Sequence, residues 1–322
     1  MALLANSHSK PSLIVRLSGG LGNQMFQYAA ALPVAKRNRL PLFIDTTCLH
    51  GQDSYCYSLG VFRISSQVVS TGKLQSFTFR LACSPTLVLK PATTIVRALF
   101  GNLLMLREAQ LFSVDSRLWS LPPRRTTCMH GYWQCHEYFT GAEHHIRQEF
   151  EFRDPPTAPN GSMLSRILAS NAVSIHVRRG DYLTLKDAPV LGLNYYQRAV
   201  ELIRSRVINP HYFVFSDDIP WTKANLCLPQ ESTFLDINSA QAPVAMDSHL
   251  PGQRRINDHE DLRLMSACRH HIIANSSFSW WGAWLNVRTD KIVVAPKYWG
   301  CRPATYYPAL FPPQWVLVDN LP

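Results

Sequence analysis

Several patterns that mark common classes of protein are missing from this sequence. None of the eight cysteines forms a C-x-x-C pair, and no group of cysteine and histidine repeats a zinc-binding spacing. The motifs G-x-x-x-x-G-K, H-E-x-x-H and G-x-S-x-G are absent, which argues against a P-loop nucleotidase, a zinc peptidase and an α/β-hydrolase. No Asp-x-Asp pair is present to hold a metal on a diphosphate. We therefore expect arginine and helix dipoles to neutralise any diphosphate that binds.

Neither a signal peptide nor a membrane-spanning helix is expected. The first residues, MALLANSHSKP, place no charged region before an apolar run, and no window offers about 18 uninterrupted apolar residues. The nearest approach, residues 94–112, is broken by polar and charged side chains and predicts an amphipathic helix packed on the core. Because the cysteines show no disulfide pattern, we expect reduced thiols and a cytoplasmic location.

Charge is scarce and unevenly placed. Only 17% of the 322 residues are charged and 46% are hydrophobic, which excludes disorder and allows one large domain or two medium ones. The net charge is +10, and residues 73–125 hold eight basic and two acidic residues, a surplus of 8 − 2 = +6. Such a segment suits a phosphate-bearing ligand, nucleic acid or an anionic membrane, or is simply a solvated face. We expect no nucleic-acid partner and at most weak peripheral attachment to the inner face of the plasma membrane.

The first half of the chain predicts a parallel sheet. Residues 12–17 (SLIVRL) indicate a buried strand, followed by a glycine-rich turn, a helix over 23–38 and a second strand over 40–45. This strand–turn–helix–strand order is typical of parallel α/β folds. Residues 46–125 give no clear pattern. A further strand is expected over 128–134 and a helix over 136–150.

A segment rich in proline and polar residues, 153–161, predicts a domain boundary. We expect an N-terminal tail over 1–11, domains over 12–155 and 156–300, and a C-terminal segment over 301–322. The second domain alternates regularly between strands and helices, which predicts a doubly wound α/β domain. Its expected strands are 172–177, 211–215, 232–236, 271–275 and 291–295, and its expected helices are 194–207, 219–226, 258–269 and 278–286.

The glycine-rich turn after the first strand partly matches a dinucleotide-binding fingerprint. It contains Gly22, and Asp45 ends the next strand, where a ribose-binding acid would lie. However, Met25 occupies the third glycine position and would obstruct close packing of helix on strand. The remaining interpretation is a turn that approaches a ligand at a helix N-terminus, with Asn23 and Gln24 as amide donors. A tight turn without a ligand is the alternative.

The segment His176–Tyr182 (HVRRGDY) carries the clearest sign of anion binding. It follows a predicted strand at the carboxyl end, where doubly wound sheets bind ligands, and two adjacent arginines there are costly unless they meet anions. Alternation places Arg178 on the face of His176 and Arg179 on the other. One arginine can then bind a phosphate while the other pairs with Asp181 or a neighbouring helix. Surface salt bridges are the alternative.

A second junction between strand and helix, Asn275–Gly282 (NSSFSWWG), also suits an anion. Ser277 is expected to cap the helix, and hydroxyls beside free amides at a helix N-terminus bind negative charge. A capped helix without a ligand is the alternative. Asn275 also begins an N-glycosylation sequon, which we expect to be a false positive because it lies in an apolar turn.

Taken together, five segments of the chain resemble glycosyltransferase family 11, the α-1,2-fucosyltransferases, and its bacterial members above all. They occur in the order of the family and span about residues 13–300, while 46–125 matches weakly. The segments are Gly19–Ala29 (GGLGNQMFQYA), His176–Tyr182, Phe215–Asp218 (FSDD), Asp261–Leu285 and Lys291–Trp299 (KIVVAPKYW).

The resemblance implies a GT-B fold, in which two Rossmann-like doubly wound domains face each other across a cleft. The N-terminal domain would serve the acceptor and the C-terminal domain the donor. It further implies GDP-fucose as donor substrate, with no metal or other cofactor. L-Fucose would pass with inversion from the β-linked nucleotide sugar to the 2-hydroxyl of a galactose-containing acceptor. The product would be a Fuc-α1,2-Gal linkage in a surface glycan such as an O-antigen.

The resemblance also implies roles for individual residues. His176 would touch guanine or ribose, Arg178 the β-phosphate, and Asp261 the N1 and N2 hydrogens of guanine. Asp217 and Asp218 are weaker candidates, near the ribose or purely structural. The other residues implied for GDP-fucose binding are Gly22, Asn23, Gln24, Asn275, Ser276 and Ser277, of which Asn23 would reach the donor phosphate from the opposite domain and the two serines would meet the diphosphate.

The group that takes the proton of the attacking hydroxyl is left open. Asp181 is nearest to the phosphate-binding motif and is expected to act in catalysis, although it could serve only to position Arg179. Asp187 and Glu137 are the alternatives. An oxocarbenium-like attack needs the base only late in the reaction.

Two other classes of function remain open on sequence alone. One is an NAD-dependent oxidoreductase built on the glycine turn and Asp45, which would be stabilised by NAD rather than by guanosine diphosphate. The other is a non-catalytic glycan-binding module built on the eight Trp and twelve Tyr, which would not turn over GDP-fucose. The sequence specifies neither the preferred galactoside nor the oligomeric state.

Overall fold

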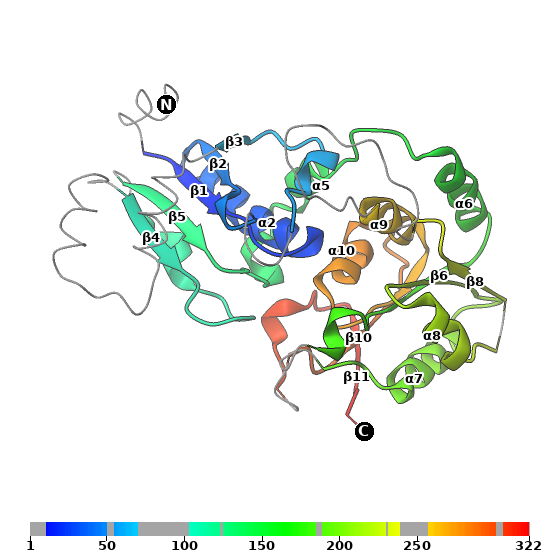
Figure 1. The fold of residues 1–322 in the computed structure, drawn as a ribbon. Coiled ribbons are helices and arrows are strands. Elements are labelled where there is room, and N and C mark those ends of the chain that lie inside the picture. Colours follow the sequence, from blue (N-terminus) through cyan, green and yellow to red (C-terminus); the bar gives the residue numbers. More distant parts are fainter. Residues whose placement is uncertain are drawn as a thin grey trace. The chain divides into compact units, whose positions relative to one another are not determined.

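The computed structural model describes residues 11–49, 55–69, 103–122, 125–184, 189–229, 231–238, 257–300 and 305–321. The chain divides into two compact units, Met1–Phe152 and Arg153–Pro322. Within the described ranges, each unit is built on one parallel sheet (Figure 1). The division falls at the start of the breaker-rich segment 153–161.

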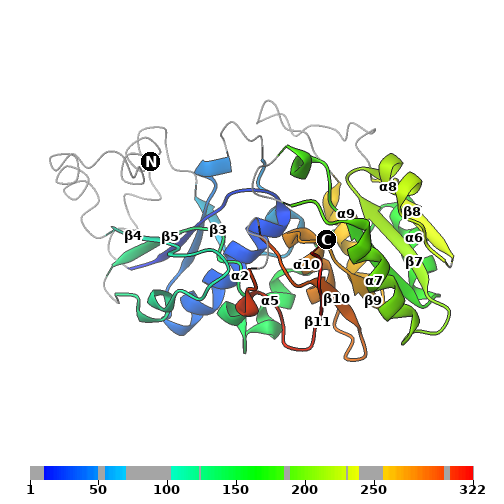
Figure 2. The same ribbon diagram turned by 90° about the horizontal axis from the view of Figure 1, so that it is seen from below.

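The first unit contains a sheet of strand order β3-β2-β1-β5-β4. Its strands are β1 (Leu13–Arg16), β2 (Leu42–Asp45), β3 (Gln67–Val69), β4 (Leu103–Arg107) and β5 (Thr126–His130). Helix α2 (Leu21–Arg37) packs on β1 and β2 (Figure 2). Its side chains are buried over most of its length. The chain runs outward from β1 through β2 to β3, whereas β4 and β5 lie on the other side of β1. The strand order therefore reverses between β1 and β5.

The turn between β1 and α2 depends on a glycine. Gly19 has φ +72°, a left-handed conformation that glycine adopts without strain, and a Cβ there would lie 2.5 Å from Nδ2 of Asn23. The backbone of Gly20 is then extended, and α2 starts at the next residue. At its other end, Lys36 and Arg37 in the last turn complement the helix dipole.

The second unit contains a sheet of strand order β11-β10-β9-β6-β7-β8, with all described pairs parallel. Its strands are β6 (Ala172–Val177), β7 (His211–Ser216), β8 (Ser232–Leu235), β9 (His270–Ile272), β10 (Val293–Pro296) and β11 (Val316–Val318). Its helices are α6 (Ala158–Leu168), α7 (Leu193–Arg204), α8 (Ile219–Asn225), α9 (Asp258–Ala267) and α10 (Ser277–Leu285).

Both faces of the second sheet are covered. On one face Val173 and Ile175 of β6 pack with Tyr195 of α7 in a buried apolar cluster. On the other, Phe213 of β7 packs with Leu264 of α9. All six residues of β6 are buried, as expected of a central parallel strand. The predicted doubly wound α/β organisation of the second half is confirmed.

Several expectations for the first half were wrong. The predicted helix over 94–112 is contradicted by the strand β4, because Leu103–Arg107 pairs with β5; residues 94–102 lie outside the described ranges. The strand expected over 128–134 ends at His130, since Gly131 has φ +156°. The helix expected over 136–150 is broken at Gly141 (φ +83°) into a 3₁₀ turn and α5 (Glu143–Glu149). Much of the basic segment 73–125 also lies outside the described ranges.

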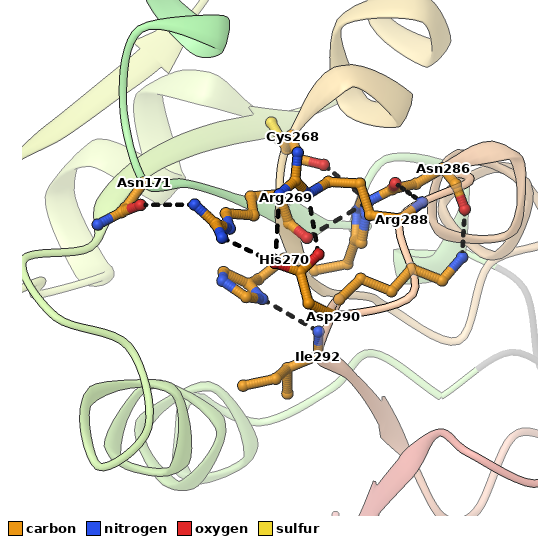
Figure 3. Close-up of polar contacts among 10 residues, drawn as sticks. Asn171, Cys268, Arg269, His270, Asn286, Arg288, Asp290 and Ile292 are labelled. Atoms are coloured by element: carbon orange, nitrogen blue, oxygen red, sulfur yellow. Dashed lines mark hydrogen bonds and ion pairs between the residues drawn. The ribbon is translucent and has the colours of Figure 1, made fainter.

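A polar network occupies the amino edge of the second sheet (Figure 3). Asp290 receives Nη2 of Arg269 at 2.7 Å and Nε of Arg288 at 3.0 Å. Nδ1 of His270 accepts the backbone N–H of Ile292 at 3.0 Å. These groups are therefore paired with one another within the fold. No helix within the described ranges is long and apolar enough to cross a membrane.

Candidate functional site

The carboxyl edge of the second sheet gathers three of the predicted motifs. From β6 the chain runs to β7 and β8 on one side and to β9, β10 and β11 on the other, so the strand order reverses between β6 and β9. Open α/β sheets bind ligands outside the carboxyl ends of the strands at such a point. The HVRRGDY segment follows β6, the FSDD segment ends β7, and the NSS turn follows β9.

Arg178 is held between two carboxylates at this edge. Its Nη2 lies 2.8 Å from Oδ1 of Asp181, and its Nη1 lies 3.1 Å from Oδ2 of Asp217. The ring of Tyr182 lies 5.5 Å from the guanidinium carbon. Nε is buried and has no hydrogen-bond partner among the described residues. The guanidinium is therefore fixed in place with its Nε–H donor unused, which suits an anionic ligand.

Arg179 is directed to a different partner. Its guanidinium stacks on Trp221 of α8, and its Nε lies 3.4 Å from Oδ2 of Asp218, the N-cap of the same helix. The prediction that one of the two arginines binds a neighbouring helix is confirmed. Asp181 contacts Arg178 and not Arg179, so the alternative role suggested for Asp181 was assigned to the wrong arginine.

Asp217 fixes the loop that follows β6. Its Oδ1 accepts the backbone N–H of Arg179 at 2.9 Å, while Oδ2 pairs with Arg178. Gly180 allows this approach, because a Cβ on Gly180 would lie 2.7 Å from Oδ2 of Asp217. Asp217 had been expected to be ribose-binding or structural, and the contacts give it a structural role in holding Arg178.

His176 lies near the end of β6 and is 4% exposed. Its Nδ1 is buried without a hydrogen-bond partner in the described part of the chain, and its ring lies 5.7 Å from that of Phe278 in α10. Burial lowers the pKa of His176 well below its usual range, and Asp217 only partly offsets this. The neutral imidazole offers one donor and one acceptor, as a nucleobase or ribose contact requires.

The start of α10 supplies backbone donors. The helix begins at Ser277, and Ser276 is the N-cap; the prediction that Ser277 caps the helix was wrong by one residue. Ser276 is 6% exposed. The hydroxyl of Tyr182 donates to the carbonyl of Asn275 at 3.0 Å and so ties the HVRRGDY loop to this turn. The first-turn amides of α10 and the guanidinium of Arg178 thus belong to one connected edge, with the charge and donors that a phosphate needs.

Asn275 uses one half of its side-chain amide within the fold, and Oδ1 is buried without a hydrogen-bond partner among the described residues. The side chain is 3% exposed, and Nδ2 donates to the carbonyls of Pro189 at 2.9 Å and Trp299 at 3.3 Å. Nδ2 thus has a structural role, and the expectation that Asn275 binds GDP-fucose stays a prediction. Because the side chain is buried, the sequon is a false positive, as expected.

Asp261 lies in the first turn of α9 and belongs to a buried polar network. Its Oδ1 accepts from Nδ2 of Asn238 at 2.7 Å, and Asn238 in turn pairs reciprocally with Asn160 at 2.9 and 3.0 Å. Burial raises the pKa of Asp261 to about 7, against the hydrogen bond from Asn238, and the nearby Asp258 adds to the rise. Burial also raises the pKa of Asp258 to about 6. The role of Asp261 in guanine binding stays a prediction.

Gln24, in the first unit, was assigned to the wrong role. Its side chain is fully buried, and Nε2 donates to the carbonyls of Gly19 at 2.9 Å and Cys56 at 2.7 Å. Its Oε1 accepts the backbone N–H of Ser58 at 2.9 Å. Since every polar atom of the amide is used, Gln24 braces the glycine turn instead of meeting a substrate.

The other two first-unit candidates have different surroundings. Gly22 is buried within α2. Asn23 is partly exposed, and its Oδ1 accepts Nε2 of Gln134 at 2.7 Å, which links the turn after β1 to the segment after β5. A phosphate contact from Asn23 stays a prediction.

The acid expected for dinucleotide binding is already paired. Oδ2 of Asp45 lies 2.7 Å from Nε of Arg16, both side chains are buried, and Oδ1 accepts the backbone N–H of Thr47 at 3.0 Å. Met25 fills the core at the third glycine position. These contacts argue against the oxidoreductase hypothesis. Arg16 was not recognised from sequence, although a charged residue ending the apolar strand SLIVRL was a usable signal.

Two candidate bases are not supported. Glu137 lines a hollow of about 520 Å³ together with Pro33 and Arg37, at the end of α2 far from the glycine turn. Asp187 lies outside the described residues. Within the described ranges, no group of three or more His, Cys, Asp or Glu side chains is placed to hold a metal ion.

Two units that are each built on a parallel sheet, each with a reversal of strand order, are consistent with a GT-B-like fold. The family model of glycosyl transferase family 11 matches residues 92–319, and the chain belongs to this family. It is 30% identical to the "O-antigen biosynthesis glycosyltransferase WbnK" of Escherichia coli over 88% of this chain and 93% of that protein. It is also 30% identical to an "Alpha-1,2-colitosyltransferase" of Escherichia coli, over 96% of this chain and 99% of that protein.

Solved structures agree on the fold. NodZ α-1,6-fucosyltransferase soaked with GDP-fucose matches with a TM-score of 0.50 at 15% identity, over 86% of this chain and 93% of that chain. A variant of Arabidopsis thaliana FUT1 in complex with GDP matches with a TM-score of 0.50 at 10% identity, over 90% of this chain and 71% of that chain. The resemblance to family 11 and the two-domain GT-B-like fold are confirmed. The alternative hypothesis, a non-catalytic glycan-binding module, was wrong, because the chain is a glycosyltransferase.

Proposed function

We propose that this glycosyltransferase moves L-fucose from GDP-β-L-fucose to the 2-hydroxyl of a galactoside, with inversion and without a metal, in the synthesis of a surface glycan. The observation that carries the proposal is the carboxyl edge of the second sheet. There Arg178, fixed by Asp181 and Asp217, shares an edge with the N-terminus of α10. The name of WbnK supports the setting in O-antigen synthesis, and the name of the colitosyltransferase supports an α-1,2 linkage.

The chemistry follows from where negative charge develops. The acceptor hydroxyl attacks the anomeric carbon opposite the nucleotide, and the bond to the β-phosphate oxygen breaks with its electron pair. Arg178 and the dipole of α10 stabilise the charge that grows on the diphosphate. Both groups are held in position before the reaction, so little reorganisation opposes the transition state.

His176 and Asp261 suit the nucleoside end of the donor. The neutral, unpartnered imidazole of His176 matches a ribose hydroxyl or a base nitrogen. A carboxylate at Asp261 accepts the two N–H groups of guanine, which adenine and uracil do not present in the same arrangement. We therefore propose GDP as the leaving group.

Colitose is a second candidate for the transferred sugar. The relative that spans 96% of this chain is named as a colitosyltransferase. Colitose is fucose without its 3-hydroxyl, so the reacting centre and the nucleotide are shared. The two donors therefore differ only in contacts to one hydroxyl group.

The test is a donor and acceptor screen with the purified protein. GDP-fucose and GDP-colitose are offered with lactose or N-acetyllactosamine, and GDP-mannose and UDP-galactose are the control donors. We expect GDP release and a fucosylated product that an α-1,2-specific fucosidase cleaves. Preference for GDP-colitose would reassign the sugar, and turnover of UDP-galactose alone would contradict the proposal.

A ligand-binding experiment tests recognition of the nucleotide independently of the sugar. GDP should raise the melting temperature of the wild-type protein, and NAD should not. Arg178→Ala should weaken the GDP effect, while Lys223→Ala, which removes an exposed cation on α8, should leave it unchanged.

A further inference from the structure

The most exposed apolar side chains of the described residues lie together at the amino edge of the second sheet. Ile208 is 79% exposed, Val287 73% and Leu168 68%, more than any other large apolar side chain in the described ranges. Leu168 ends α6 ahead of β6, Ile208 lies between α7 and β7, and Val287 lies between α10 and β10. Connections that enter parallel strands meet at one edge of the sheet. Three such side chains at one edge differ from the scattered single residues that a surface ordinarily carries.

Hydrogen bonds through Asn171 join these connections into one surface. Nδ2 of Asn171 donates to the backbone carbonyl of Ile208 at 2.8 Å, and its Oδ1 accepts Nη1 of Arg269 at 3.3 Å. Arg269 in turn reaches Asp290 at 2.7 Å, in the connection that holds Val287 (Figure 3). The apolar side chains are therefore carried by loops that are tied to one another.

Exposed arginines surround the apolar side chains. Arg204 and Arg206 are exposed, and neither makes an ion pair with a described residue. Together with Ile208 they line a hollow of about 540 Å³, in which Glu201 is the one acidic residue. Arg166, near the end of α6, is also exposed, and its Nη2 donates to a hydroxyl group of β8 at 3.4 Å. These guanidinium groups are available to an anionic partner.

The balance of charge at this edge is positive. The connections that reach it hold six Lys or Arg residues and three carboxylates; they are residues 165–171, 201–211, 226–231, 268–270 and 285–292. A second copy of the chain seated symmetrically on this surface would set arginine against arginine, which opposes a dimer. Cations around protruding apolar side chains suit a surface that is anionic outside and apolar beneath, as a membrane of acidic lipids is.

We propose that the amino edge of the second sheet docks on an anionic lipid membrane. Arg204 and Arg206 bind lipid phosphates, while Ile208, Val287 and Leu168 enter the boundary between headgroups and acyl chains. This surface is separate from the basic segment 73–125 of the first unit. The inference goes beyond the proposed function and does not depend on it.

Docking at this edge leaves the candidate nucleotide site open to solvent. The central strand β6 has six residues, so at about 3.3 Å per residue the amino and carboxyl edges of the sheet lie about 20 Å apart. Arg178 lies at the carboxyl edge, beyond the reach of the side chains at the amino edge. Substitutions in the docking surface can therefore be made without touching the candidate site.

The test is sedimentation of the full chain with vesicles of phosphatidylcholine alone and of phosphatidylcholine mixed equally with phosphatidylglycerol. We expect binding to the anionic vesicles, little to the neutral ones, and release at high salt, because salt screens the attraction. Arg204→Gln/Arg206→Gln should bind the anionic vesicles about 30-fold more weakly, since each arginine near an anionic surface contributes about fivefold. The matched control, Arg198→Gln/Lys223→Gln, removes two exposed cations outside this surface and should bind as the wild type does.

Ile208→Ser distinguishes a membrane from a polyanion in solution. Loss of an apolar side chain that enters lipid should weaken vesicle binding about tenfold, whereas binding to heparin should not change. The control is Ile237→Ser, which removes a side chain 40% exposed beyond the carboxyl end of β8. The melting temperatures of all variants should match the wild type, because the substituted side chains are exposed.

Three results would overturn the proposal. One is absence of wild-type binding to anionic vesicles, or equal weakening by the control pair. Another is binding to heparin as tight as to vesicles with no effect of Ile208→Ser, which would assign the surface to a polyanion. The third is a concentration-dependent dimer that Ile208→Ser dissociates, which would assign the surface to a second copy of the chain. None of these measurements uses GDP-fucose, so failure of the proposed function leaves this test intact.

Discussion

The guanidinium carbon of Arg179 lies 3.5 Å from the ring centroid of Trp221, whereas its neighbour Arg178 is clasped by Asp181 and Asp217. Adjacent arginines are thus divided between two tasks. Arg179 anchors the loop to α8, and Arg178 keeps a buried donor for a ligand.

Replacing each arginine should reveal this division. Arg178→Ala should lower kcat about 10²–10³-fold, because it removes a preorganised partner of the developing anion. Arg178→Lys should also be poor, since an ammonium group cannot hold two carboxylates and a phosphate in one plane. Arg179→Lys should keep most of kcat and lose about 0.5–1 kcal/mol of stability through the weakened stack on Trp221.

The measurements are steady-state kinetics, GDP affinity and thermal unfolding on the same preparations. An equal loss of kcat at the two positions, with normal GDP binding, would contradict the assigned tasks.

Gly180→Ala should impair catalysis through Asp217. The added Cβ would lie 2.7 Å from Oδ2 of Asp217, so the carboxylate must move and release Arg178. We expect kcat to fall while the free energy of unfolding changes little. The control is Gly161→Ala in α6, where the nearest heavy atom to a Cβ is 3.9 Å away and helix propensity should add about 0.5–1 kcal/mol. Unchanged kcat in Gly180→Ala would show that the contact between Asp217 and Arg178 is not needed for catalysis.

Asp261 should make both stability and GDP binding depend on pH. Its pKa of about 7 in the folded state exceeds the unfolded value of about 4, so the folded state binds more protons between these values. The free energy of unfolding should therefore fall as pH rises from 4 to 7. GDP affinity should rise between pH 6 and 8, because the ionised carboxylate accepts the guanine N–H groups.

Asp261→Asn removes both effects. At pH 8 the variant should be at least as stable as the wild type, yet bind GDP about 10- to 100-fold more weakly, because an amide donor faces a guanine donor. Chemical denaturation and calorimetry at pH 5, 6.5 and 8 measure the two quantities. If the variant is instead unfolded, Asp261 is a structural residue of α9 and guanine binds elsewhere.

Activity should persist in EDTA. The prediction rests on the missing Asp-x-Asp pair and on the cationic groups that replace a metal at the diphosphate. Modest stimulation by Mg²⁺ through faster GDP release is compatible with it. Abolition of transfer by the chelator, with rescue by one particular cation, would show that a metal takes part.

Most of the second half of the fold could be predicted from sequence because its strands β6, β7, β9 and β10 are short apolar runs, each followed by a motif. Strand β11 was missed, since three residues after a proline pair carry little signal and depend on pairing with β10. Strand β4 was taken for part of a helix because its apolar run fits either structure, and only its pairing with β5 decides. Distant pairing of this kind is not encoded in local periodicity.

In the candidate site, too, local sequence predicted some features and distant contacts decided others. The spacing in HVRRGDY predicted that its two arginines point to different faces. It did not predict which carboxylate each arginine would pair with. Gln24 and Asn275 were expected to face a ligand, and the Nδ2 or Nε2 group of each donates instead to backbone carbonyls brought in from other segments. Whether a polar side chain serves the substrate or the fold depends on neighbours that the sequence does not place.

The most direct test of the account is the structure of the product formed from GDP-β-L-fucose and lactose. Proton NMR of the isolated trisaccharide reports the anomeric configuration of fucose and the galactose carbon that bears it. The account predicts an α-fucoside on the 2-hydroxyl of galactose, formed by the wild type and about 10²–10³-fold more slowly by Arg178→Ala. A β-fucoside, a linkage to another hydroxyl, or full activity in Arg178→Ala would contradict it.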